Sequence, residues 1–155
     1  MRDWAYAFNM NVQKLTRDEA PDPYFAIKIV PKTEDMVVFV MRLRSFPHYI
    51  IMQATLELGT QHKATWAKLS PAQKMQLLEQ LRIEMNRCRV VNDIPIDLAK
   101  NKITLERRLP ITDELTEDAF VKQIEGFRSD LYLARDTMVL GMEQSSGAVS
   151  TREGH

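Results

Sequence analysis

The last third of the chain carries the most constraining pattern in the sequence, a stripe of apolar residues that repeats every three or four positions. From Phe120 to Met142 the successive steps are 4, 3, 4, 3, 4 and 4. Because an α-helix has about 3.6 residues per turn, these side chains share one face of a single long helix. The stripe consists of Phe120, Ile124, Phe127, Leu131, Ala134, Met138 and Met142. We expect this helix to begin near Thr116 and to pack its stripe on a large apolar surface.

A second helix is predicted from a start signal. Ser70 is followed by Pro71 and, three positions after the serine, by Gln73. This is the pattern of a capped helix start, with proline at the first helical position. The apolar residues that follow are Met75, Leu78, Leu81, Met85 and Cys88. Their spacing of three or four predicts a helix over residues 71–88.

Two shorter helical segments are also expected. Residues 3–8 form two turns, because Trp4 and Phe8 stand four apart and share a face. Residues 60–69 have lost the alternation of a strand, and we expect a short helical turn there.

Apolar runs, several of them with a two-residue period, predict β-strands between these helices. The expected strands are residues 24–31, 36–44, 49–58, 89–96 and 101–111. Short polar connections join the first three strands, which indicates an antiparallel meander. The fourth is broken by a turn at Asn92-Asp93.

Strands grouped in runs, with helices between the runs, are typical of an α+β fold. We expect an antiparallel sheet of about five strands with helices packed on it, in the order α-βββ-α-ββ-α. A chain of 155 residues matches one domain in size, and residues 1–144 form it. Residues 145–155, "SSGAVSTREGH", lack any apolar pattern, and we expect a disordered C-terminal tail there.

Charge and cysteine content argue against several classes of protein. Lys and Arg number 21, Asp and Glu number 21, and the net charge is zero, which argues against a nucleic-acid partner. Apolar runs are too short for a membrane span. A single cysteine, Cys88, excludes an intramolecular disulfide. We therefore expect a cytoplasmic protein with no nucleic-acid or membrane partner.

Metal-binding and catalytic patterns are absent from the sequence. His48, His62 and Cys88 are widely separated along the chain, so no pair of them has the close spacing of metal ligands. Cys88 falls on the apolar stripe of its helix, where a thiol is a packing residue. The five glycines form no phosphate-binding motif. We predict no metal, no cofactor and no enzymatic activity.

Six residues are candidates for an interface. Arg42 and Arg44 share a strand face and could present two guanidinium groups to an acidic partner, although a solvated strand end is the explanation that we favour. Arg107 shares a face with apolar neighbours, so it lies beyond the covering helix or pairs with a carboxylate at an interface. Leu133, Val139 and Leu140 are apolar positions outside the main stripe of the last helix. Extra apolar faces indicate contact with a second subunit, and we predict a homodimer.

Two blocks of the sequence, "KLSPAQK" and "ITLERRLPITDELTEDAF", together with "FAIKIVP", resemble an uncharacterised archaeal family, a domain of unknown function. The resemblance covers residues 2–142. The fold of that family is similar to the fold of type III secretion chaperones and YbjN-like proteins. The resemblance implies a compact α+β domain, often dimeric, that offers its sheet and helices to other proteins. It implies no catalytic residues.

These observations favour a non-enzymatic protein-interaction module, chaperone-like, that acts as a homodimer and binds a polypeptide through an apolar or strand-edge surface. The alternatives are a small-molecule-responsive regulatory domain and an enzyme with an unrecognised site. An exposed apolar patch would favour the first hypothesis. A cavity with converging polar groups would favour the others.

Overall fold

The computed structural model describes residues 11–15, 23–30, 36–57, 59–88, 96–97 and 102–150. Six strands form one sheet in the order β1-β2-β3-β4-β6-β5, and every neighbouring pair is antiparallel. The strands are β1 (Asn11–Lys14), β2 (Pro23–Val30), β3 (Val38–Leu43), β4 (Tyr49–Glu57), β5 (Ile96–Asp97) and β6 (Lys102–Pro110). The helices are α2 (Thr60–Lys68), α3 (Pro71–Arg87) and α4 (Glu117–Ser150). The predicted α+β class with an antiparallel sheet and the β2-β3-β4 meander are confirmed.

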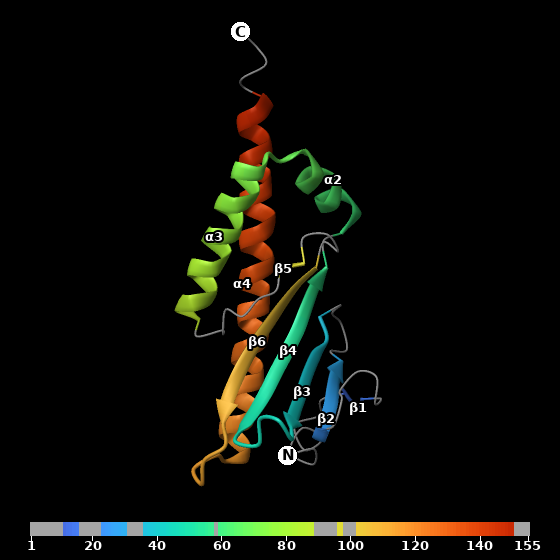
Figure 1. Cartoon of the computed structure of the whole chain (residues 1–155), viewed down its shortest axis with the longest axis vertical. Coiled ribbons are helices and arrows are strands. Elements are labelled where there is room, and N and C mark those ends of the chain that lie inside the picture. Colours follow the sequence, from blue (N-terminus) through green and yellow to red (C-terminus); the bar gives the residue numbers. More distant parts are fainter. Residues whose placement is uncertain are drawn as a thin grey trace.

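Helix α4 runs along the whole molecule (Figure 1). The strands cross its lower half, while α3 and α2 lie at its upper half. All seven residues of the apolar stripe, from Phe120 to Met142, are buried. They belong to one core that also contains apolar residues of the sheet, of α3 and of the α2 segment. The predicted helix and its packing face are therefore confirmed.

The strand register decides which side chains face α4. Met52 of β4 lies directly opposite Val40 of β3 and opposite Arg107 of β6. Opposed residues of an antiparallel pair point to the same face of the sheet. Val40 and Met52 are fully buried, and Arg107 contacts Asp130 of α4. An arginine therefore lies in the middle of the face that α4 covers.

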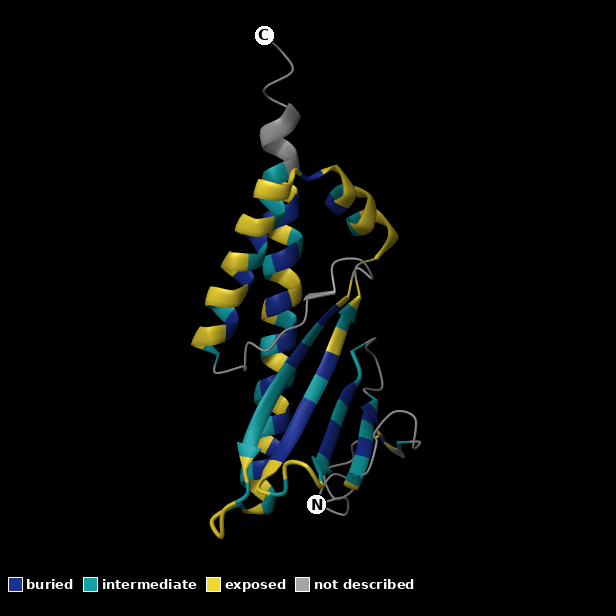
Figure 2. Ribbon diagram, in the orientation of Figure 1, coloured by how far each residue is buried: buried dark blue, intermediate teal, exposed yellow. Residues whose placement is uncertain are grey.

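Helix α3 begins as the sequence predicts. The Ser70 hydroxyl accepts a hydrogen bond from the Gln73 backbone N–H at 3.3 Å, and the Gln73 side chain accepts one from the Ser70 N–H at 2.9 Å. The buried residues of the helix are Leu77, Leu81 and Met85. The prediction that Met75 lies on the packing face is wrong, since its side chain is 70% exposed. Leu77 takes that place because the buried positions of α3 follow the four-residue steps 77, 81 and 85. The buried part of α3 lies on its side toward α4 (Figure 2).

The segment before α3 is a helix of nine residues, α2, as the loss of strand alternation predicted. Trp66 is buried in the core, and Leu69, the residue after the helix, is buried with it. Lys74 of α3 places its ammonium 5.7 Å from the centroid of the Trp66 ring. These contacts fix α2 against the start of α3.

Strand β1 was not predicted. Its four residues contain a single apolar side chain, Val12, which is too little for an alternating pattern. The strand exists through its pairing with β2, where Val12 lies opposite Ile29 and both are buried. The pairing with β2 therefore makes this segment a strand, although its own sequence has no strand pattern.

Three other predictions fall wholly or partly outside the described residues. The predicted N-terminal helix over residues 3–8 lies outside them. Residues 89–95 of the strand predicted at 89–96 also lie outside them, and its last residue, Ile96, is the first residue of β5. Helix α4 continues to Ser150, beyond the boundary that we predicted at residue 145. Residues 151–155 are not described, so the tail stays a prediction. No helix in the described part of the chain has both the length and the apolar character needed to cross a membrane.

The close approach of α3 and α4 at Gly141 generates a stability prediction. A Cβ added to Gly141 would overlap the Leu77 Cδ1 atom, and Leu77 is buried between the helices. We expect Gly141→Ala to lower the free energy of unfolding by about 1–3 kcal/mol through overpacking, in spite of its better helix propensity. Chemical denaturation measures the change.

Gly126, in the same helix, is the matched control. A Cβ there would lie 3.5 Å from the nearest atom, Nη1 of Arg107, which is an ordinary contact. Gly126→Ala should leave stability unchanged or raise it by up to about 1 kcal/mol, since alanine is the better helix former. Equal effects of the two substitutions would contradict the proposed crowding at Leu77.

Candidate functional site

Three of the large apolar residues that α3 and α4 expose are candidates for a contact surface. Leu133 is 41% exposed, Leu140 is 56% exposed and Ile83 is 44% exposed. The two leucines are seven residues apart, so they lie on one side of α4. A groove of about 260 Å³ lies between the two helices. It is lined by Gln73, Gln76, Leu77, Gln80, Gly141, Gln144 and Ser145.

Helical spacing relates two of the apolar residues to residues that line this groove. Ile83 follows Gln80 by three residues on α3, and Leu140 precedes Gln144 by four on α4. Residues at these spacings are neighbours on a helix surface. We call the groove together with Ile83, Leu133 and Leu140 the outer helical face. It is rich in glutamine and apolar side chains. The sequence did not mark Ile83 as a candidate, because the exposure of its side chain depends on how α3 packs.

Val139, the third apolar candidate of α4, lies elsewhere. It is half-buried and lines a cavity of about 360 Å³ at the end of the sheet. Consecutive helical residues are rotated by about 100°, so Val139 and Leu140 face different surroundings. The structure therefore separates a set of residues that the sequence had grouped.

We call this cavity the sheet-end pocket. Its walls come from the end of β4, the start of β6, α2 and α4. The lining residues are Leu56, Glu57, His62, Ile103, Arg135, Asp136, Met138 and Val139. Four of these residues are apolar, and the others are three charged residues and a histidine. Only Val139 of this group was a candidate in the sequence.

The charges of the sheet-end pocket are paired. Lys102 forms an ion pair with Glu57, and the hydrogen bond that Lys102 donates lowers the pKa of the Glu57 carboxyl. Arg135 donates two hydrogen bonds of 3.0 Å to one oxygen of Asp136. The guanidinium of Arg135 also lies 5.2 Å from the centroid of the Tyr132 ring. Each carboxylate of the pocket thus has a cation beside it.

The two histidines of the central segment lie at opposite ends of β4. His48 immediately precedes the strand and His62 lies in α2, which follows it. Nine residues of extended chain span roughly 30 Å, so the two imidazoles cannot share a ligand. Within the described part of the chain, no cluster of three or more His, Cys, Asp or Glu residues could hold a metal ion.

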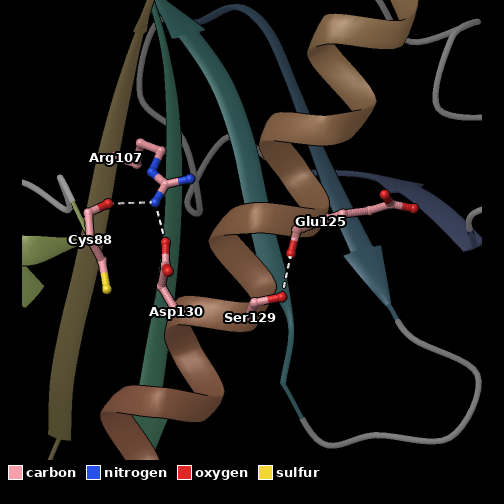
Figure 3. Close-up of polar contacts among 5 residues, drawn as sticks. All are labelled: Cys88, Arg107, Glu125, Ser129 and Asp130. Carbon is pink, nitrogen blue, oxygen red and sulfur yellow. Dashed lines mark hydrogen bonds and ion pairs between the residues drawn. The ribbon is translucent and has the colours of Figure 1, made fainter.

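Arg107 forms a largely buried polar cluster (Figure 3). Its Nη2 donates a hydrogen bond of 2.9 Å to the Cys88 carbonyl oxygen and forms an ion pair with Asp130 of α4. The guanidinium also lies 5.6 Å from the centroid of the Phe127 ring. Only 13% of the Arg107 side chain and 17% of the Asp130 side chain are exposed. The sequence left two explanations for Arg107. The structure shows the second, a pair with a carboxylate, which here is that of Asp130 between the sheet and α4.

This cluster connects three elements at one point. Arg107 belongs to β6, Asp130 to α4, and Cys88 ends α3. Neighbouring Ser129 donates instead to the Glu125 carbonyl oxygen within α4, and the Glu125 carboxylate points away from Arg107 (Figure 3). The Arg107 Nε atom is buried and has no hydrogen-bond partner among the described residues. The cluster therefore fixes the packing of helices on the sheet.

Cys88 lies in surroundings that disfavour a thiolate. Burial raises the pKa of its thiol, and the Asp130 carboxylate raises it further through its charge and a hydrogen bond. Arg107 acts in the opposite direction with a smaller effect. The thiol stays protonated near neutral pH, which is the chemistry of a packing residue.

Arg42 and Arg44 both contact Tyr24. Each guanidinium lies 4.9 Å from the centroid of the Tyr24 ring. Arg42 also donates a hydrogen bond of 2.9 Å to the Pro47 carbonyl oxygen in the turn between β3 and β4. The two arginines thus have local roles, and their binding to an acidic partner stays a prediction.

Comparison with known proteins gives two similarities. The model of a family described as "Uncharacterized conserved protein (DUF2299)" matches residues 1–133. The crystal structure of an uncharacterized protein from Methanothermobacter thermautotrophicus has a TM-score of 0.70 to this chain at 15% sequence identity. The similarity covers 92% of this chain and 94% of the archaeal one, and it shows a shared fold. No curated protein matches the chain. Neither similarity concerns secretion chaperones or YbjN-like proteins, so that part of the resemblance stays a prediction.

The buried ion pair generates a second stability prediction. Asp130→Ala removes the carboxylate and leaves the Arg107 guanidinium largely buried without its counter-charge. We expect a loss of about 3–5 kcal/mol in the free energy of unfolding, the range for breaking a buried pair from one side. Replacing both residues, with Arg107→Met and Asp130→Leu, should recover most of that loss. Chemical denaturation of both variants tests this. If the double variant is as unstable as Asp130→Ala, the charge argument is wrong.

Cys88 provides a chemical probe of the same cluster. Because the pKa of its thiol is raised, alkylation by iodoacetamide should be slower at pH 8 than alkylation of an unstructured cysteine peptide. Asp130→Asn removes the largest electrostatic cause of the shift, so the rate should rise and its midpoint should move to lower pH. Circular dichroism controls for unfolding. An unchanged pH profile in a folded Asp130→Asn variant would show that Asp130 does not act on the thiol.

Proposed function

We propose that this chain, which belongs to the family of uncharacterised conserved proteins DUF2299, is a non-enzymatic protein-interaction module that acts as a homodimer through its outer helical face. The observation that carries the proposal is the exposure of Ile83 on α3 and of Leu133 and Leu140 on one side of α4. Neighbouring exposed apolar residues are typical of a surface that another molecule covers.

The chemistry of the outer helical face suits a second copy of the same chain. A twofold interface brings each surface against itself, so every group must be compatible with its own kind. Glutamine meets this requirement because its amide both donates and accepts hydrogen bonds. Four of the groove residues are glutamines, and the chain has no net charge that would oppose association. Depletion of charge is also typical of the core of an interface.

The spacing of the two leucines fits helix-to-helix contact. Leu133 and Leu140 are one heptad apart on a helix of 34 residues. Apolar residues at this spacing form the seam of two-helix contacts, where side chains of one helix fit between those of the other. The groove beside Gly141 offers space for such side chains. We therefore propose that α4 and its symmetry mate cross at the outer helical face.

The chaperone-like part of the proposal adds a polypeptide held by the dimer. The resemblance to secretion chaperones motivates it. Among the described strands β1 lies at an edge of the sheet, and an edge strand is the kind of surface that binds an extended peptide. Self-association is its first testable step.

Light scattering coupled to size-exclusion chromatography tests the dimer. Wild-type protein should give twice the mass of one chain at high concentration and dissociate on dilution. The double substitution Leu133→Glu/Leu140→Glu should give the mass of one chain throughout, because it places like charges opposite each other in the interface.

Met75→Glu is the matched control, since Met75 is an exposed apolar residue of α3 outside the groove. This variant should remain dimeric. The proposal fails if wild-type protein keeps the mass of one chain across a wide concentration range, or if Met75→Glu dissociates the dimer as readily as the leucine substitutions do.

A further inference from the structure

We propose that the sheet-end pocket is a binding site for an uncharged molecule with an apolar body and a single hydroxyl group. The pocket uses none of the residues of the outer helical face, so the proposal does not rest on the dimer. Its volume of about 360 Å³ lies within the range of roughly 300–1,000 Å³ that small-molecule sites occupy.

The apolar part of the lining favours a hydrocarbon body. Leu56 of β4 and Ile103 of β6 lie directly opposite each other in the sheet, so their side chains are neighbours on one face. Met138 and Val139 line the pocket from α4. Ile103 and Met138 also belong to the buried core, which fixes their positions. A hydrocarbon chain or ring placed here would exchange water for contact with these apolar side chains.

The charged part of the lining disfavours an anion. Two carboxylates, those of Glu57 and Asp136, line the pocket beside a single guanidinium, that of Arg135. Arg135 already donates two hydrogen bonds to Asp136, which neutralises its charge. An anionic ligand would therefore give up its hydration without gaining a free counter-charge.

A cation is disfavoured as well, because each carboxylate has a cation of the protein beside it. The pKa of the Glu57 carboxyl is lowered by the hydrogen bond and the charge of Lys102, and further by the charge of Lys63. Asp136 is held by Arg135. An ammonium group that approached either carboxylate would be repelled by these cations. The charges of the site therefore favour a ligand without net charge.

The hydrogen-bonding groups that remain in the lining are of both kinds. Among the described residues, nothing donates to Oε2 of Glu57 or to Oδ2 of Asp136. Arg135 directs its Nε and Nη2 groups at Asp136, and its Nη1 group donates to no described residue. A hydroxyl both donates and accepts hydrogen bonds. Because Arg135 and Asp136 are in contact, one hydroxyl can donate to the carboxylate and accept from the guanidinium.

Four probes of similar size separate the head groups: 1-octanol, its isomer 1-methoxyheptane, octanoate and octylamine. Each is titrated into the full chain, and isothermal titration calorimetry reports the affinity. Octanol should bind saturably, once per chain, and more tightly than both charged probes. It should also bind about tenfold more tightly than the ether, which cannot donate a hydrogen bond to a carboxylate.

Three results would contradict the proposal. An ether that binds as tightly as octanol would overturn the hydroxyl group. A charged probe that binds as tightly as octanol would overturn the uncharged ligand. Absence of saturable octanol binding would overturn the site itself.

Removal of the two carboxylates tests the charge argument. Glu57→Ala/Asp136→Ala replaces side chains that are each 56% exposed, so the fold should tolerate the change. It leaves Lys102 and Arg135 without their counter-charges. Octanol should then lose its advantage over the ether, and octanoate should bind more tightly than it does to wild-type protein. An unchanged ranking of the probes would contradict the assignment.

Glu79→Ala/Glu84→Ala is the matched control, because it removes two paired carboxylates of α3 that lie outside the pocket. This variant should bind all four probes as wild type does. Val139→Trp should abolish octanol binding by filling the pocket. Equal effects of the control and of the pocket variants would contradict the location of the site.

A direct readout covers the case in which a pocket variant fails to fold. In wild-type protein, the imidazole NMR signals of His62, which lines the pocket, should shift on octanol addition, while those of His48 should not. The dimer-breaking Leu133→Glu/Leu140→Glu variant should bind octanol unchanged, so failure of the dimer proposal and failure of this one give different results. A shift of both histidines, or of neither, would contradict the proposal.

Discussion

The packing of α4 along its full length is the constraint on which the rest of the structure depends. A helix of 34 residues is about 50 Å long, whereas β4 and β6, with nine residues each, span roughly 30 Å. The sheet can therefore bury only part of the apolar stripe. The remainder of α4 needs other partners, and α3 and the α2 segment supply them through Leu77, Leu81 and Trp66. The outer helical face and the sheet-end pocket both lie in the part of the molecule where α2 and α3 pack on α4.

The Arg107–Asp130 pair holds the two packing arrangements together. It lies on the sheet face below α4 and also contacts the end of α3 through the Cys88 carbonyl. A largely buried ion pair adds little net stability, because desolvation offsets its attraction. Its directional hydrogen bonds do, however, favour one arrangement of helices on the sheet over others that would bury equal apolar area. We infer that the role of this pair is to position the helices on the sheet. This role explains why an arginine occurs in an otherwise apolar row.

The candidate surfaces could be predicted from the sequence only in part. Leu133 and Leu140 fall outside the stripe of α4, and simple helical periodicity therefore marks them as excess apolar surface. Val139 carries the same signal, but α2 and the strand ends enclose its side of the helix. Met75 shows the converse error, since its spacing suited the α3 stripe while the helix packs through Leu77. Spacing gives relative positions on a helix, and it does not say which neighbour covers which side.

The sequence by itself determined the elements whose information is local. These are the capping box at Ser70, the stripe of α4 and the apolar runs of β2, β3, β4 and β6. Each arises from residues a few positions apart, and the α+β class follows from their order. Only the tertiary structure decided the pairing of β1, the partner of Arg107 and the sheet-end pocket that joins His62 to Val139. These depend on contacts between residues far apart in the chain, such as Arg107 with Asp130 and Leu56 with Ile103. Local periodicity carries no information about such contacts, because many arrangements of the same elements bury the same apolar faces.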